Sequence, residues 1–268
     1  MAIRVVVAGA TGWVGKALVP AVLGEIDLVL AGAVARNAAG VDAGIASGRE
    51  ACGVAIAATL EEALAIPSDV VVDYTKPHVV KGHVLAAIAA GRNVVVGTSG
   101  LGADDYAEIA SAAENSGVGV IAAGNFSITA TLMKRFALMA AKYVPDVEVI
   151  DYAGAKKPDA PSGTARELAE ALSAVRGAST ARPQSEVSGI PATRGAAVGS
   201  GAGVQVHALR LPSFVLSCEA LFGLPDERLT IRHDAGSSAA PYVAGTLLAV
   251  RRVVGMKGLV RGLDRLID

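Results

Sequence analysis

The sequence predicts an α/β protein that begins with a doubly wound parallel sheet and continues into a smaller α+β domain with a mixed or antiparallel sheet. Three observations support this prediction. Over about the first 125 residues, short runs rich in Val and Ile alternate with Ala/Leu stretches of helical period, which is typical of a parallel sheet covered on both faces. A glycine pattern directly follows the first run. After residue 200, three apolar or alternating runs are separated only by turns.

The expected first domain, residues 1–125, consists of buried strands with helices between them. Runs of β-branched residues bounded by Gly, Asp or Asn predict strands at 3–8, 28–34, 70–73, 93–96 and 118–122. Segments rich in Ala and Leu predict helices at 14–23, 79–90 and 103–116.

The expected second domain, residues 126–239, has a different pattern of apolar runs and loops. A helix at 130–143 precedes a strand at 147–152 and a second helix that opens near residue 162. The loop at 177–203 is too long for an ordinary connection, so we expect it to be functional, an oligomer arm, or mobile. Strands follow at 204–210, 215–222 and 227–233, and a last helix begins near residue 240 and ends around 254.

Composition excludes several classes of protein. The 268 residues are 52% hydrophobic and 18% charged, and a net charge of -1 provides no general field for nucleic acid or an anionic membrane. Cys52 and Cys218 lie far apart and the histidines lack metal-ligand spacing, so we expect no disulfide and no metal. The first apolar run is too short for a signal peptide, and the uncharged stretch 115–133 is broken by polar residues and glycines; we expect a cytoplasmic location.

The loop after the first strand has the pattern of a phosphate-binding turn. Gly9, Gly12 and Gly15 lie between a predicted strand and a predicted helix, where the backbone must turn tightly and direct helix N–H groups at a pyrophosphate. The alternative is a glycine turn that only makes the connection between strand and helix tight and binds no ligand. We favour a Rossmann-type dinucleotide site, with candidate residues Gly9, Ala10, Thr11, Gly12, Trp13 and Val14.

The end of the second strand indicates which dinucleotide is preferred. Sites selective for NAD carry a carboxylate there for the ribose 2′-hydroxyl, whereas this chain has Arg36 and no acid. Arg36 is therefore expected to pair with a 2′-phosphate, which makes NADPH the preferred cofactor with NADH possible. The alternative is that Arg36 is a solvated surface charge.

Two later loops carry small and hydroxyl side chains where a doubly wound sheet presents its ligand crevice. Thr75 follows the strand at 70–73, and Gly97, Thr98 and Ser99 follow the strand at 93–96. We expect them to line the ribose and nicotinamide sites, although turn chemistry alone would also select such residues.

Several motifs together resemble the 4-hydroxy-tetrahydrodipicolinate reductase (dihydrodipicolinate reductase) family. They are residues 9–15, 72–77 (VDYTKP), 96–100 (VGTSG), 123–127 (AGNFS) and, most specifically, 157–165 (KPDAPSGTA). The resemblance implies an N-terminal dinucleotide domain, a substrate and tetramer domain, and a C-terminal helix, residues 240–268, that returns to the first domain. It also implies cofactor contacts at Gly124, Asn125 and Phe126, carboxylate binding at Gly163 and Thr164, and proton donation by Lys157.

The run at 162–165 also has a physical interpretation of its own. Ser162 is a plausible N-cap, and the apolar stripe behind it predicts a helix. The N–H groups of Gly163 and Thr164 would lie at the positive end of that helix, which suits a substrate carboxylate. An ordinary capped helix is the alternative. Ser162, Gly163 and Thr164 are the candidate substrate-binding residues.

The chain also departs from the family pattern. A histidine pair that precedes the family's lysine is replaced by Ala153 and Gly154, neither of which can move a proton. Residues 233–239 lack basic residues that family members carry near a Ser-Ser pair, and 214–218 replace a more polar stretch. We therefore expect an atypical member. Lys157 is the preferred acid, with Lys156 and Tyr152 as alternatives, and a second ammonium nearby would favour proton release from it.

The expected reaction is NADPH-dependent hydride transfer to a C=N or conjugated C=C bond of a small carboxylated substrate, such as a cyclic imine, in an altered pocket. One alternative is a genuine 4-hydroxy-tetrahydrodipicolinate reductase of the lysine and diaminopimelate pathway. Another is a catalytically idle NADPH-binding sensor, and reduction of an aldehyde or ketone is a weaker option. The resemblance and the predicted second sheet favour a homotetramer.

Overall fold

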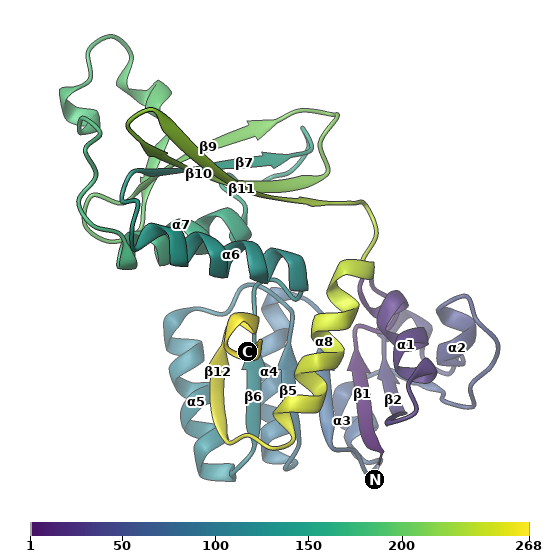
Figure 1. Ribbon diagram of the computed structural model, residues 1–268. Coiled ribbons are helices and arrows are strands. Elements are labelled where there is room, and N and C mark those ends of the chain that lie inside the picture. Colours follow the sequence, from purple (N-terminus) through teal and green to yellow (C-terminus); the bar gives the residue numbers. More distant parts are fainter. Residues whose placement is uncertain (1, 268) are drawn as a thin grey trace. The chain divides into compact units, whose positions relative to one another are not determined.

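The computed structural model describes residues 2–267, which form two compact units. The first contains the chain up to Ile128 together with the residues from Ala239 onward, and the second is Thr129–Ser238. Figure 1 labels their helices and strands. No helix within residues 2–267 is long and apolar enough to cross a membrane.

The first unit is built on a seven-stranded sheet in the order β12-β6-β5-β4-β1-β2-β3, in which all neighbours are parallel. Its strands are β1 Ile3–Ala8, β2 Leu28–Val34, β3 Ile56–Ala57, β4 Val70–Asp73, β5 Asn93–Val96, β6 Gly119–Ala122 and β12 Gly258–Arg261. Its helices are α1 Gly15–Gly24, α2 Ala43–Ala46, α3 Leu60–Leu64, α4 Pro77–Ala89, α5 Ala103–Ser116 and α8 Ala240–Val253, with single turns η1 Arg36–Ala38 and η4 Leu263–Arg265.

Helices cover both faces of this sheet, which confirms the doubly wound prediction (Figure 1). Val5 and Val7 of β1 share a core with buried residues of α1, α2 and α8. Val6 and Ala8 point to the opposite face and share a second core with α3, α4 and α5. Because both faces are buried, these strands are continuous apolar runs, and burial of their side chains supplies the main driving force for folding.

The strand order places a crevice at the end of β1. β1 pairs with β2 on one side and β4 on the other, so the connections leave β1 and β4 in opposite directions across the sheet. In open parallel sheets this switch point leaves a gap beyond the carboxyl ends of the strands, and ligands bind there.

The C-terminal segment corrects one prediction. Helix α8 ends at Val253, close to the end that the sequence pattern predicted, and 254–267 continue as β12 and η4 instead of the helix through residue 268 that the resemblance implied. Gly258 begins the strand and Gly262 follows it, with φ values of 75° and 92°, left-handed conformations that glycine adopts readily. β12 adds a seventh parallel strand beside β6. The two-residue β3 and the short helices α2 and α3 were also missed, because periodicity needs longer segments.

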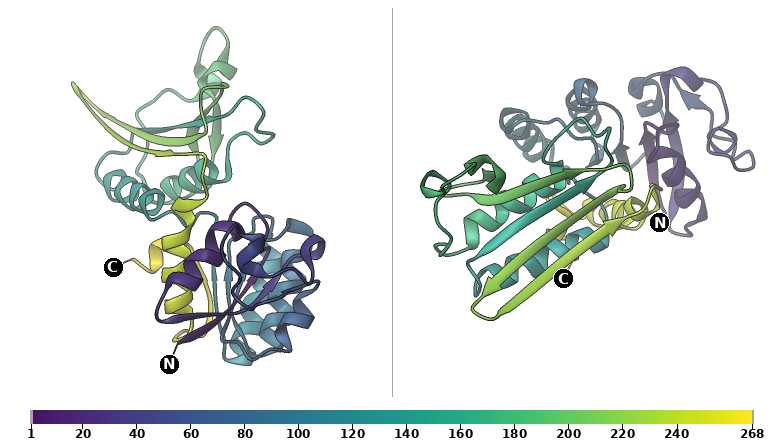
Figure 2. Two further views of the ribbon diagram at one scale, coloured as in Figure 1. Left: turned by 90° about the vertical axis from the view of Figure 1, so that its right-hand side faces the viewer. Right: turned by 90° about the horizontal axis from the view of Figure 1, so that it is seen from above.

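The second unit is a five-stranded mixed sheet in the order β11-β10-β7-β9-β8, covered on one face by two helices (Figures 1 and 2). Its strands are β7 Val147–Ala153, β8 Ala196–Val198, β9 Val204–Arg210, β10 Leu216–Leu224 and β11 Glu227–Ala235, and its helices are α6 Ile128–Ala141 and α7 Gly163–Val175. β7 and β9 pair in parallel while the other neighbours are antiparallel.

The long loop predicted at 177–203 contains structure of its own. It holds the single turns η2 Gln184–Glu186 and η3 Pro191–Arg194 and the edge strand β8. The Asp146 carboxylate anchors its start by accepting hydrogen bonds from the hydroxyls of Ser179 and Thr180.

Candidate functional site

The turn between β1 and α1 has room only for glycine at its critical positions. Gly9 has a φ of 86°, and a Cβ there would overlap the carbonyl oxygen of Tyr74. A Cβ at Gly15 would overlap the carbonyl oxygen of Gly9. Val14 caps α1 without a side-chain hydrogen bond, so the positive end of this helix remains available to an anion. The turn therefore fits a pyrophosphate.

A cavity of about 670 Å³ lies over this turn. Its lining includes ten of the predicted cofactor residues: Gly9, Thr11, Gly12, Trp13, Val14, Arg36, Thr75, Gly97, Thr98 and Ser99. The structure therefore brings together loops that follow β1, β2, β4 and β5. Four predicted residues are not in the lining: Ala10, Gly124, Asn125 and Phe126.

Three of these residues, Ala10, Asn125 and Phe126, have other contacts within the first unit. Ala10 is buried, and its N–H donates to the carbonyl of Val34 at 3.1 Å. Asn125 accepts a hydrogen bond from the Ser127 N–H at 2.8 Å in the loop after β6. Phe126 is buried and packs edge-on against the Tyr74 ring, with centroids 6.1 Å apart. Phe126 therefore supports the cavity from behind.

The charged residues of the cavity qualify the prediction about the ribose. Arg36 is exposed at the start of η1 and lines the cavity together with Lys76. Glu61, at the start of α3, lines it too. Sequence reasoning missed Glu61 because it follows the short strand β3. The cavity lining thus contains both a guanidinium, the kind of group that pairs with a 2′-phosphate, and a carboxylate, the kind of group that binds a 2′-hydroxyl.

Buried Asp73 joins the two loops that follow β4 and β5. Its Oδ1 accepts hydrogen bonds from the Thr75 hydroxyl at 2.8 Å and from the Thr98 hydroxyl at 2.6 Å. Thr98 Oγ1 in turn accepts from the Thr75 N–H at 2.7 Å. The other oxygen, Oδ2, lies 2.8 Å from Nδ1 of His83, which also lines the cavity. Because hydrogen bonds to a carboxylate are the stronger kind, Asp73 fixes these loops firmly.

Tyr74 forms part of the cavity wall. Its hydroxyl lies 2.8 Å from the Thr246 hydroxyl of α8, and burial raises the pKa of the phenol well above its usual value. A Cβ at Gly97 would overlap the Tyr74 ring, so the glycine in the loop after β5 is required for packing.

In the second unit, Asp151 holds the loop that precedes α7. This carboxylate, 0% exposed, accepts hydrogen bonds from the Ser162 N–H and hydroxyl, each at 2.7 Å, and from the Arg210 guanidinium at 2.8 Å. Arg210 also donates to the Asp159 carbonyl at 2.8 Å. Ser162 caps α7, as predicted, by accepting from the Ala165 N–H at 3.3 Å. Sequence reasoning missed Asp151 and Arg210.

Lys157 has a different neighbour from the one expected. Its Nζ lies 2.6 Å from Oδ1 of Asp159, and this hydrogen bond, opposed by partial burial, holds the pKa of the Asp159 carboxyl below its usual value. Lys156 is exposed. A carboxylate, rather than the second ammonium that the sequence suggested, is therefore the charged partner of Lys157.

Tyr152 lies on the face of the sheet opposite to Asp151, because successive strand residues point to opposite faces. Its hydroxyl is 3.2 Å from Glu219 Oε2, and the Arg232 guanidinium lies 4.7 Å from its ring centroid. Burial and the nearby Glu219 carboxylate raise the pKa of Tyr152.

Two departures from the family pattern are neighbours in the structure. Ala153 is fully buried, and its carbonyl accepts from the Leu211 N–H at 3.1 Å. A Cβ at Gly154 would lie 3.2 Å from the carbonyl oxygen of Phe214. The turn at 211–214 therefore packs against 153–154, and a larger residue at 154 would require that turn to move.

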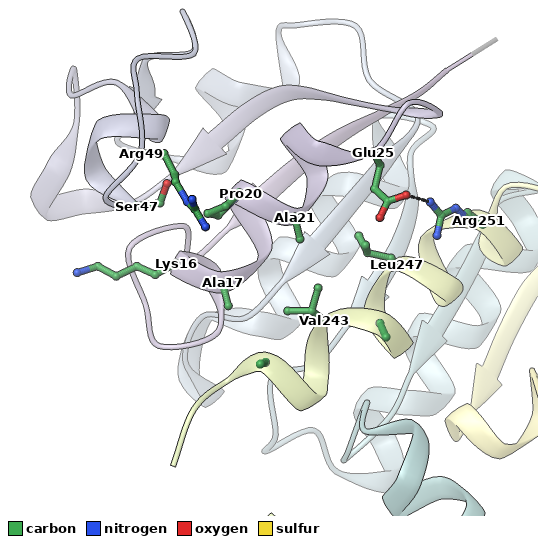
Figure 3. A pocket seen from close by; sticks show the side chains of 12 residues that line it. Lys16, Ala17, Pro20, Ala21, Glu25, Ser47, Arg49, Val243, Leu247 and Arg251 are labelled. Atoms are coloured by element: carbon green, nitrogen blue, oxygen red, sulfur yellow. Dashed lines mark hydrogen bonds and ion pairs between the residues drawn. The ribbon is translucent and has the colours of Figure 1, made fainter. Parts of the chain in front are cut away.

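A second cavity in the first unit, about 650 Å³, lies between α1 and α8 (Figure 3). Ala17, Pro20, Val243 and Leu247 contribute to an apolar surface, and the Arg251 guanidinium is ion-paired with Glu25 at 2.6 Å. The predicted cofactor residues all lie elsewhere.

Comparison with known proteins gives full-length matches. Two family models cover the chain, "Dihydrodipicolinate reductase, N-terminus" over residues 3–126 and "Dihydrodipicolinate reductase, C-terminus" over residues 129–267. A 4-hydroxy-tetrahydrodipicolinate reductase of Desulfitobacterium hafniense is 39% identical over 268 residues, 99% of each chain. The protein of that name from Synechococcus elongatus is 38% identical, covering 99% of this chain and 98% of its own.

Solved structures agree with these matches. Dipicolinate-bound dihydrodipicolinate reductase from Paenisporosarcina sp. TG-14 has a TM-score of 0.84 and 30% identity, with 100% of both chains covered. An amine dehydrogenase from Mycobacterium smegmatis, with a TM-score of 0.69 and 16% identity over 99% of this chain and 96% of its own, shares the fold alone. The chain therefore belongs to the dihydrodipicolinate reductase family of NAD(P)H-dependent oxidoreductases.

Proposed function

We propose that this protein is a 4-hydroxy-tetrahydrodipicolinate reductase that prefers NADPH and also accepts NADH. One observation carries the proposal: the loop at 157–164, which contains Lys157 and the capped start of α7, is held by the buried Asp151 carboxylate in a chain similar throughout to proteins of that name. This interpretation replaces an altered substrate as the preferred one, because relatives at 38–39% identity cover nearly the whole chain.

The first unit supplies the cofactor site. The N–H groups at the start of α1 bind the pyrophosphate, and the turn at Gly9 allows it to approach the backbone. Arg36 binds the 2′-phosphate of NADPH. The loops that Asp73 fixes, together with residues 124–126 beyond β6, bind the ribose and nicotinamide. When bound, the dihydronicotinamide supplies a hydride.

The second unit supplies the substrate site. The N–H groups of Gly163 and Thr164, at the positive end of α7, bind a substrate carboxylate, and Ser162 holds that end in place. Lys157 donates the proton that balances the hydride, to the ring nitrogen if a C=N bond is reduced or to the adjacent carbon if a conjugated C=C bond is reduced. The solved relative from Paenisporosarcina sp. holds dipicolinate, a ring dicarboxylate of the kind this arrangement would bind.

The open face of the five-stranded sheet suits assembly with further copies of the chain. It combines apolar and paired charged groups, including Tyr152 with Arg232 and Glu148 with His207. A homotetramer built through this face is our expectation. Light scattering of the purified protein at several concentrations tests it, and a monomer at every concentration would contradict it.

The decisive experiment follows NADPH oxidation with freshly generated 4-hydroxy-tetrahydrodipicolinate and with a panel of cyclic imines, imino acids and oxo acids. We expect kcat/KM for the dicarboxylate to exceed that for every other compound. Lys157→Ala should lower kcat at least 100-fold, the lower end of what a positioned acid contributes, with little change in NADPH affinity. Lys156→Ala, the exposed neighbour, is the matched control and should retain activity. Unchanged turnover in Lys157→Ala would exclude Lys157 as the acid.

A second candidate function is reduction of a different cyclic imine in an altered pocket. The contact of Gly154 with the Phe214 carbonyl favours it, because both residues depart from the family pattern and lie together. Faster turnover of another imine in the same panel would support this candidate. NADPH binding without turnover of any compound would instead indicate an idle sensor protein.

A further inference from the structure

His83 lines the nucleotide cavity but belongs to none of the family motifs identified in the sequence. It lies in α4, where Val80, Val84 and Ile88 point toward the sheet and are buried. His83 and Val79 occupy the neighbouring stripe of the helix, and both line the cavity. His83 therefore lies on the face of α4 that lines the cavity and not on the face that packs against the sheet.

The hydrogen bond to Asp73 determines which ring nitrogen carries the proton. Nδ1 of His83 lies 2.8 Å from Oδ2 of Asp73, a carboxylate that is 0% exposed. A carboxylate oxygen accepts hydrogen bonds only, so Nδ1 is the donor, and in a neutral ring Nε2 is then an acceptor. Among residues 2–267, Nε2 has no hydrogen-bond partner. Nε2 is thus an acceptor of fixed orientation on a side chain that lines the cavity, and it is available to a donor group of a bound ligand.

We propose that His83 is a cofactor-binding residue whose Nε2 accepts a hydrogen bond from the adenosine half of the dinucleotide, and that Asp73 is the positioning residue that holds the ring for it. Two donor groups exist on that half, the adenine 6-amino group and the ribose hydroxyls. Both present an N–H or O–H group to an imidazole acceptor, so the recognition chemistry is the same.

The assignment to the adenosine half follows from the cavity lining. Arg36 and Asn37 after β2, and Thr59 and Glu61 beside α3, line the same cavity as His83. In a doubly wound sheet the end of the second strand meets the adenosine ribose. Helices α3 and α4 share one buried core on the same face of the sheet, so His83 projects from the helix next to the adenosine side.

This inference rests on the proposed cofactor site, and the experiment separates the two. Trp13 is the only tryptophan in the chain and lines the cavity, so energy transfer from its indole to bound dihydronicotinamide reports binding without substrate. The central variant is His83→Asn, whose amide N–H replaces Nδ1–H toward Asp73 while nothing replaces Nε2. His78→Asn is the matched control, because His78 is exposed on the same helix.

We expect His83→Asn to raise the Kd for NADPH and NADH roughly three- to tenfold, the effect of losing one neutral hydrogen bond, while His78→Asn leaves it unchanged. His83→Gln, whose amide oxygen can reach the place of Nε2, should recover part of the affinity. The hypoxanthine analogue of NADH lacks the 6-amino group. If the analogue binds more weakly than NADH to the wild type but equally well to His83→Asn, the 6-amino group is the donor. If the analogue binds more weakly than NADH to both proteins by the same factor, the donor is a ribose hydroxyl.

Three outcomes would overturn the inference. In the first, the wild-type protein binds NADPH and His83→Asn binds it equally well, which refutes the role of His83 alone. In the second, His83→Asn fails to fold and a folded His83→Phe variant, which has no polar atom on the ring, binds NADPH as the wild type does. In the third, the wild type binds neither NADPH nor NADH, which refutes the proposed function as well.

Discussion

Replacement of Asp151 by Asn tests the central feature of the proposed substrate site. The carboxylate accepts two hydrogen bonds from Ser162 and one from Arg210 at 2.7 to 2.8 Å. An Asn side chain has one acceptor oxygen, and its NH₂ group would face a donor. The Arg210 guanidinium, whose side chain is 17% exposed, would lose its ionic partner.

The expected destabilisation follows from these contacts. Leaving one member of a buried ion pair without its partner costs about 3–5 kcal/mol. The two bonds to Ser162, at about 1.5–3 kcal/mol each for a charged acceptor, form part of the same network and are not simply added to that figure. We therefore expect Asp151→Asn to lower the free energy of unfolding by about 3–5 kcal/mol.

Urea unfolding followed by circular dichroism measures this loss. Asp159→Asn is the matched control: its carboxylate is half exposed, so the loss of its pair with Lys157 should cost less than about 1 kcal/mol. In folded Asp151→Asn protein the KM for the dicarboxylate should rise, since the start of α7 is no longer held, while the Kd for NADPH stays unchanged. A loss within about 0.5 kcal/mol, the range of ordinary surface substitutions, together with an unchanged KM, would refute the reasoning.

Three further predictions concern separate features. Arg36→Asp should reverse the preference for NADPH over NADH, measured as the ratio of the two Kd values, and an unchanged ratio would show that Arg36 is only a surface charge. Gly97→Ala should lower stability by about 1–3 kcal/mol through overlap with the Tyr74 ring, and also weaken NADPH binding; Gly236→Ala, also in a loop and likewise without a positive φ but in open space, is the matched control and should leave both unchanged. Since the pKa of Asp159 is lowered, its pairing with Lys157 contributes stability above the ordinary value of 3.8 and loses it as the pH falls through the lower folded value. Carboxyl ¹³C shifts should show a pKa for Asp159 below 3.8 that rises in Lys157→Ala, and the same pKa in both proteins would contradict the pairing.

Local patterns in the sequence were sufficient for most of the fold. The runs at 3–8, 28–34, 70–73 and 93–96 coincide with β1, β2, β4 and β5, because strands buried on both faces must be apolar throughout. Strand β12 could not be recognised in this way. Its four residues, Gly258–Arg261, contain few β-branched side chains, and only pairing with β6, more than a hundred positions earlier, makes them a strand.

The candidate site shows the same division. Glycines at 9, 12 and 15 indicated a phosphate turn because the required backbone excludes a Cβ, and Ser162 indicated a helix cap because the cap is local. Asp73 and Asp151 gave no comparable signal. Their partners lie at positions 75, 83 and 98 and at positions 162 and 210, and burial alone distinguishes these carboxylates from surface acids.

The sequence by itself determined the fold class, the family and the dinucleotide turn, since each depends on patterns within a short segment or on motifs read in order. Only the tertiary structure decided which charges meet. It paired Lys157 with Asp159 instead of a second lysine, placed Glu61 beside Arg36 in one cavity, and oriented His83 through Asp73. The physical reason is that electrostatic and hydrogen-bond partners are set by distance in space, which strand order and chain crossovers determine and local sequence does not.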